Sequence, residues 1–143
     1  MNDDELEQAV RVLESYNRQL EALTDQVRLL QASRDEAVRA SRSLQAIADA
    51  KPGEEVLLPV GASSFVTVVV GERKKAVVGI GSGVSVEKGL TEAKSFMDGN
   101  ADSISEALKR SIAAMQEVSG YAEDLQNAIQ AEYSRRKQAL PMQ

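Results

Sequence analysis

The chain has 143 residues and a formal net charge of −5, and it contains neither cysteine nor histidine. The lack of cysteine excludes disulfides and thiol chemistry, and the lack of histidine removes the commonest general base and the commonest metal ligand. Only 3% of the residues are aromatic, so the large side chains that usually fill a thick core are scarce. This composition favours binding over catalysis, and we expect a protein that is not an enzyme and needs no cofactor or metal.

Charge and hydropathy also limit the compartment and the partners. The first residues, Met1 to Glu5, are acidic where a secretory signal would be basic and then apolar. No run approaches the roughly 18 apolar residues that a membrane span needs. We therefore expect a soluble, cytoplasmic protein with no membrane partner. An acidic chain does not attract nucleic acid through its overall field, so we also expect no nucleic-acid partner.

Residues 3–50 show the heptad spacing that is typical of a coiled-coil helix. The positions that recur every three or four residues are Leu6, Ala9, Leu13, Tyr16, Leu20, Leu23, Val27, Leu30, Arg34, Ala37, Ser41, Leu44 and Ala48. Two polar residues, Arg34 and Ser41, interrupt the pattern, and Pro52 ends it. A helix of this length spans on the order of 65–70 Å, about twice the width of a globular domain of this size. We expect residues 1–51 to form a projecting helix.

Residues 88–140 predict a second helix of similar length. Its seam positions are Leu90, Ala93, Met97, Ala101, Ile104, Leu108, Ser111, Met115, Val118, Ala122, Leu125 and Ile129. Gly99 and Gly120 lie inside the pattern, and each costs about 1 kcal/mol relative to alanine in a helix. Residues 98–100 are therefore the expected place for a kink or a frayed turn.

The centre, residues 54–87, predicts two β-hairpins in tandem. The expected strands are Val56–Val60, Ser64–Val70, Ala76–Ile80 and Val84–Val86. The glycines between 79 and 83 form a G-x-G-x-G sequence, which lacks the spacing of a dinucleotide fingerprint and suits hairpin turns better. With the two helices, these strands predict an α+β fold, in which a long antiparallel coiled coil carries two β-hairpins between its helices.

The strands carry too much apolar surface for a half-exposed sheet. The segment from Ser64 to Val70 is apolar on both faces, and some thirty residues of sheet cannot bury both faces alone. We therefore expect the hairpins to form an oligomerisation platform with other subunits. The residues expected there are Val56, Leu58, Phe65, Val66, Val68, Val70, Val77, Ile80, Val84 and Val86.

The open end of the coiled coil is the expected site for a polypeptide ligand. If the helices are antiparallel, both chain ends meet there, with acidic residues 3–5 near basic residues 135–137. We expect the coil to splay at this end and to leave seam residues without partners. The apolar candidates are Leu6, Val10, Leu13, Leu125, Ile129, Tyr133 and Leu140. Ordinary seam packing is the alternative for each of them, and it is the preferred interpretation for Leu13 and Leu125.

The connector between the helices resembles one protein family closely. The stretch L-L-P-V-G-A-S-S-F-V at 57–66 and the stretch V-V-G-I-G-S-G-V-S-V-E-K at 77–88, placed between two long helices, look like the alpha subunit of archaeal prefoldin. The resemblance covers essentially the whole chain. The two hairpins match the alpha type, whereas the beta type has one.

The resemblance implies a heterohexamer of two alpha and four beta subunits. Such complexes hold non-native polypeptides between coiled-coil tips without ATP and pass them to a group II chaperonin. The resemblance therefore implies three partners: prefoldin beta subunits, unfolded client polypeptides and the chaperonin.

Two other functions stay open from the residues alone. A coiled-coil scaffold or tether would use the same helices to bind one folded partner. A coil associated with nucleic acid is suggested by Arg34, Arg39 and Arg42, although the acidic balance of the chain opposes it.

Overall fold

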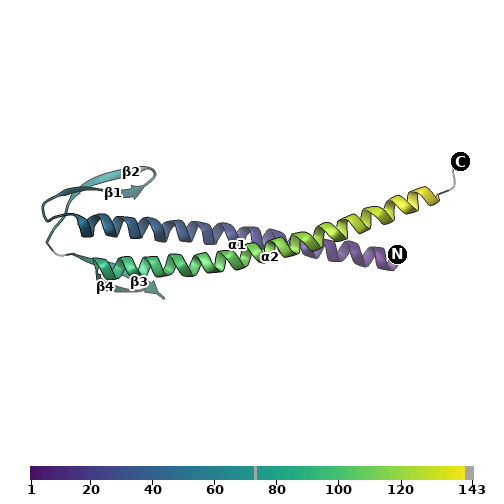
Figure 1. Ribbon diagram of the computed structural model, residues 1–143, viewed down its shortest axis with the longest axis horizontal. Helices are drawn as coiled ribbons and strands as arrows, with labels where there is room; N and C mark the ends of the chain where they lie inside the picture. Colours follow the sequence, from purple (N-terminus) through teal and green to yellow (C-terminus); the bar gives the residue numbers. More distant parts are fainter. Residues whose placement is uncertain (73, 141–143) are drawn as a thin grey trace. The chain divides into compact units, whose positions relative to one another are not determined.

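The structure is a computed structural model that describes residues 1–72 and 74–140. Within these residues the elements are α1 (Asp3–Asp49), β1 (Glu55–Gly61), β2 (Ser64–Val69), β3 (Lys75–Gly81), β4 (Val84–Gly89) and α2 (Leu90–Ala139) (Figure 1). The predicted fold class, two long helices with two β-hairpins between them, is confirmed. The chain divides into two compact units. The terminal unit comprises Met1–Leu30 and the chain from Glu106 onward, and the hairpin unit comprises Gln31–Ser105.

In the terminal unit, α1 and α2 run antiparallel and share an apolar seam. Thr24 Oγ1 lies 3.6 Å from Met115 Sδ, and nearer the chain ends the rings of Tyr16 and Tyr121 are 6.0 Å apart between centroids. The buried apolar side chains of this unit occupy predicted seam positions, namely Leu6, Val27, Leu108, Ala122 and Ile129. The heptad pattern thus identified the packed faces of both helices.

In the hairpin unit, a polar contact lies within the seam. The Ser41 hydroxyl donates to the carboxylate of Asp98, and Lys94 Nζ donates to the same carboxylate at 2.7 Å. The hydrogen bond from Lys94, and to a lesser extent that from Ser41, holds the pKa of Asp98 below its ordinary value. The contact explains why serine interrupts the apolar pattern at position 41. The frayed turn expected at residues 98–100 is absent, because α2 continues through Gly99 and also through Gly120.

Each hairpin is a separate two-stranded antiparallel sheet in the described part of the chain. In the first, Val56 pairs with Val68, and the register shifts between Pro59 and Gly61. In the second, Val78 pairs with Val86, and the register shifts between Gly79 and Gly81. The turn of the second hairpin places Gly83 at a positive φ of 76°, where glycine is well tolerated. The first turn places two non-glycine residues, Ala62 and Ser63, at φ 51° and 58°, which is a more strained backbone.

Both hairpins are attached to the helices of their own unit. Figure 1 shows β1 and β2 beside α1, and β3 and β4 beside α2. The segment between the hairpins supplies Lys74, whose Nζ donates to the backbone carbonyls of Ala48 at 2.9 Å and Ala50 at 2.8 Å. The last turn of α1 contains no basic residue of its own. Lys74 therefore supplies the charge and the donors that the exposed carbonyls at the end of α1 require.

Candidate functional site

The first candidate site is an apolar surface on the four strands. Its exposed members, here called the strand surface, are Leu57, Val60, Phe65, Val66, Val69, Val77, Ile80, Val84 and Val86. On the first hairpin, the pairing places Leu57, Phe65 and Val69 on one face. Soluble monomers rarely leave so many large apolar side chains open to water in one region. The strand surface is therefore suited to burial against another protein.

The opposite face of each hairpin is turned toward the helices. Val56 and Val68 line a depression together with Leu44 and Ile47 of α1. On the second hairpin, Val78 is buried. Lys88 Nζ lies over the ring of Phe96 in α2, 5.6 Å from its centroid. The inner faces thus anchor the hairpins to α1 and α2 and leave the outer faces open.

The predicted platform residues differ in exposure, and the difference does not follow the face alone, because exposed Val66 pairs with half-buried Leu58 and exposed Val86 pairs with buried Val78. The exposed ones are Phe65, Val66, Val77, Ile80, Val84 and Val86, the half-buried ones are Val56, Leu58 and Val68, and Val70 is buried. Val70 is covered by this chain itself, and its backbone forms hydrogen bonds with Gly53 and Glu54. Leu57, Val60 and Val69 belong to the strand surface and were missed. A strand that is apolar on both faces does not reveal which of its residues the helices cover, so the sequence could not separate these sets.

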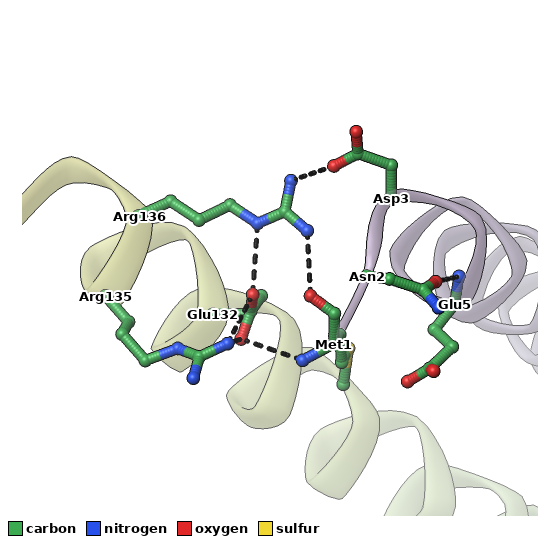
Figure 2. A network of polar contacts seen from close by, with 7 residues as sticks. All are labelled: Met1, Asn2, Asp3, Glu5, Glu132, Arg135 and Arg136. Carbon is green, nitrogen blue, oxygen red and sulfur yellow. Dashed lines mark hydrogen bonds and ion pairs between the residues drawn. The ribbon is translucent and has the colours of Figure 1, made fainter. Parts of the chain in front are cut away.

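The second candidate site is a polar cluster at the ends of the helices, here called the terminal clasp. It comprises Met1, Asp3, Glu132, Arg135 and Arg136, and Figure 2 shows its contacts. The carboxylate of Glu132 accepts hydrogen bonds from Arg135 Nη2 at 2.8 and 2.7 Å and from Arg136 Nε at 3.0 Å. The amino group of Met1 lies 3.5 Å from the same carboxylate. Glu132 is therefore the centre of the clasp.

Arg136 connects the two helices. Its Nη1 donates to the carboxylate of Asp3, and its Nη2 donates to the carbonyl of Met1 at 3.0 Å. The proximity of acidic and basic chain ends that was predicted is thus present, through Asp3 and Arg136. Asn2 begins the helix, because its Oδ1 accepts from the backbone nitrogen of Glu5 at 2.8 Å. The sequence carried a signal for this cap, an asparagine followed three residues later by a glutamate.

The clasp changes the acidity of its central groups. Hydrogen bonds from Arg135 and Arg136 lower the pKa of Glu132 from 4.5 to about 2, against the opposing effect of burial. Hydrogen bonds to Glu132 and then to Asp3 raise the pKa of Arg136. Glu132 therefore stays ionised at any pH near neutrality. A buried carboxylate that keeps its charge needs such partners.

The residues proposed for client contact do not splay apart. Leu6 is only 7% exposed and Ile129 only 6%, so both pack in the seam directly beside the clasp. Val10, Leu13 and Leu125 are half-buried, and Tyr133 and Leu140 are 53% and 68% exposed. The expected open end is closed in this structure. The physical reason is that α2 extends its seam past Ile129 with two polar residues. Arg136 binds Asp3 in the first turn of α1, and Glu132 lies 3.5 Å from the amino group of Met1, which precedes that turn.

Across residues 1–72 and 74–140, no cluster of three or more acidic side chains is arranged to hold a metal ion. Neither helix, within those same residues, has a segment both long and apolar enough to cross a bilayer.

Comparison with known proteins identifies the family. Residues 16–135 match the prefoldin subunit family. The prefoldin subunit alpha of Methanocorpusculum labreanum is 38% identical over 114 residues, which cover 72% of this chain and 78% of that protein. The prefoldin subunit alpha of Pyrococcus horikoshii is 32% identical over 120 residues, with coverage of 82% and 80%.

Solved structures agree with this assignment. A chain of the filamentous prefoldin (PFD) from Methanocaldococcus jannaschii has a TM-score of 0.63 and 25% identity, with 85% of this chain and 98% of that chain covered. The prefoldin beta subunit from Thermococcus strain KS-1 shares the fold, with a TM-score of 0.57, 16% identity and coverage of 90% and 91%. Members of the family are chaperone subunits and not enzymes. On this evidence, the chain belongs to the prefoldin subunit family, among relatives of the alpha type.

Proposed function

We propose that this chain is one subunit of an ATP-independent holdase. The assembled complex binds non-native polypeptides at the ends of its coiled coils, prevents their aggregation and delivers them to a group II chaperonin in the cytoplasm. The observation that carries the proposal is the coexistence, in one prefoldin subunit, of an exposed strand surface and a separate helix end with apolar residues. The first serves assembly and the second serves the client.

Assembly proceeds through the strand surface. Two-stranded hairpins are marginally stable alone, and here their outer faces leave Leu57, Phe65 and Val77 in water. Burial of a large aliphatic or aromatic side chain contributes about 1.5–3 kcal/mol, so nine such residues provide a strong driving force for association. The partners are beta-type prefoldin subunits, in a complex of two alpha and four beta subunits as the family resemblance implies.

Client binding takes place at the terminal end of the helices. Tyr133 and Leu140 offer exposed apolar surface there, and Leu6, Val10, Leu13, Leu125 and Ile129 supply more when the helix ends separate. A contact of this size is weak by itself. Several subunits that contact one polypeptide at once bind it much more strongly, because each further contact forms at a high effective concentration. This mechanism requires no nucleotide.

The test is aggregation of a chemically denatured protein, followed by light scattering without ATP. The chain, co-purified with a beta-type subunit, should suppress scattering at near-stoichiometric amounts. A variant complex that lacks residues 1–13 and the segment from Leu125 onward should still sediment as an assembled oligomer. It should no longer suppress the scattering. Unchanged scattering with several clients would reject the holdase and favour a tether for one folded partner. Full activity of the shortened complex would reject the placement of the client site.

A further inference from the structure

The terminal clasp occupies positions where a coiled coil ordinarily continues its apolar seam. The three- and four-residue spacing of α2 runs from Ala122 through Leu125 and Ile129 to Glu132 and then to Arg136. The burial of Glu132, which is 7% exposed, shows that the seam geometry persists there. An ionised side chain in such a position is costly to desolvate. A leucine would close the same end with less electrostatic cost.

Among the described residues, the polar contacts across the helix pair at this end are few and peripheral. Arg136 makes two of them, to Asp3 and to the carbonyl of Met1, and the amino group of Met1 makes the third, to Glu132. Asp3 is 91% exposed, and ion pairs at exposed sites contribute little to stability. The first turn of a helix is also among the first parts of a protein to open. The clasp therefore holds the end closed with a weak, reversible link.

Opening the clasp would uncover apolar surface. Leu6 and Ile129 are the buried residues nearest the clasp along their helices, and Val10 and Leu125 are half-buried one turn further in. While α1 and α2 stay paired, Leu6 and Ile129 are covered and Val10 and Leu125 are only partly exposed. Because Glu132 keeps its partner Arg135 within α2, the carboxylate would not be left without an ion pair when Arg136 releases Asp3.

We infer that the terminal clasp is a gate, which keeps the apolar end of the seam covered until a non-native polypeptide competes for Leu6, Val10, Leu125 and Ile129. This inference rests on the proposed function, because it assigns the gate to client capture. It explains why the seam ends in a polar cluster. A charged clasp closes the end in water, yet it is weak enough for an apolar ligand to displace. A continuous leucine seam would cover the same residues permanently.

The test uses two variants that should act in opposite directions. Arg136→Gln removes both contacts of Arg136 with the start of α1, so it should speed amide hydrogen exchange in residues 4–13 and raise the rate of client capture, each by about two- to fivefold. Glu132→Leu continues the apolar seam, so it should slow exchange in the same residues and reduce capture. The matched control is Arg11→Gln. It also removes one positive charge, but from an exposed ion pair with Glu7 that lies within α1. It should change neither the exchange rate nor the rate of client capture.

Both measurements are made on the full chain in complex with its beta-type partner. Exchange and capture that change in opposite directions for Arg136→Gln and Glu132→Leu would support the gate. An Arg136→Gln complex indistinguishable from the Arg11→Gln complex would overturn it, as would faster exchange without faster capture. If the unaltered complex captures no client, the proposed function fails and the role of the gate in capture fails with it. The exchange data would then still show whether the clasp holds the helix ends together.

Discussion

In the hairpin unit many apolar residues of the strands are exposed to water, whereas in the terminal unit the apolar seam is covered up to its last turn. Val77 is 75% exposed, and Leu6 is 7% exposed. The two regions also differ in how their apolar residues are covered. Within the described chain no polar cluster covers the strand surface, whereas the terminal clasp covers the end of the seam. The difference suggests two kinds of partner. Permanently exposed apolar surface requires a permanent partner, and reversibly covered apolar surface suits a transient one.

The largest effect is expected from a charge placed on the strand surface. Val77→Asp changes an exposed residue, so the isolated chain should fold as before. If the surface is buried in the complex, the unpaired carboxylate costs at least several kcal/mol, and the affinity for the beta-type partner should fall more than about a hundredfold. Sedimentation of the mixture measures this.

Leu29→Asp is the matched control for that experiment. Leu29 is 71% exposed but belongs to the terminal unit, whereas the four strands belong to the hairpin unit. The control complex should assemble normally. Equal losses for both variants would contradict the assignment of assembly to the strand surface, because a general effect of negative charge would then explain them.

The second effect concerns the attachment of the hairpins to α1. Lys74→Met keeps the aliphatic length but removes the charged donor that contacts the carbonyls of Ala48 and Ala50. Because the end of α1 would lose these hydrogen bonds, the free energy of unfolding should fall by about 1–2 kcal/mol. Urea denaturation measures the loss, with Lys75→Met on the exposed side of β3 as the control. If Lys75→Met lowered the free energy of unfolding by the same amount, the result would contradict a specific role for Lys74.

These regions also show what sequence could predict. The seam of each helix follows from spacing alone, since every predicted position on α1 and α2 is buried or half-buried. The positions of the hairpins follow from β-branched residues and glycines. The role of Lys74 could not be predicted, because it depends on how the segment between the hairpins folds back on α1. The partner of Ser41 lies 57 residues further along the chain, which no local pattern reveals.

The burial of Glu132 is the most informative feature that the sequence analysis did not predict. Its position was available from the seam spacing, which passes from Ile129 to Glu132 and Arg136. The predicted seam stopped at Ile129 and the coil was expected to splay beyond it, so the closed end was missed. Whether the seam residues beside it contact clients, as the sequence suggests, remains a prediction.

A smaller gain in stability is expected from one of the helical glycines in the terminal unit. Gly120 lies within α2, and a Cβ built there meets no other atom within 4 Å. Gly120→Ala should therefore raise the free energy of unfolding by about 1 kcal/mol, through helix propensity alone. Thermal unfolding of the chain measures the change. A loss of stability would show that position 120 needs the space which the glycine leaves beside Leu20 and Thr24.

The smallest effect is a pH dependence of the terminal unit. Because the pKa of Glu132 is lowered from 4.5 to about 2, its stabilising contribution is fully present above pH 4.5 and is lost as the pH falls toward about 2. All three tyrosines, Tyr16, Tyr121 and Tyr133, lie in the terminal unit, so their fluorescence reports its unfolding. Glu132→Gln should flatten the profile between these pH values. A profile identical to that of the unaltered chain would show that Glu132 makes no such contribution.

The most direct test of the division between permanent and transient surfaces is hydrogen exchange on the assembled complex, with and without a denatured client. We predict that assembly with the beta-type partner protects residues 55–89 before any client is present. Addition of the client should then change exchange only near the helix ends, in residues 3–13 and 125–139. Protection of the strands by the client, with no change at the helix ends, would contradict the account.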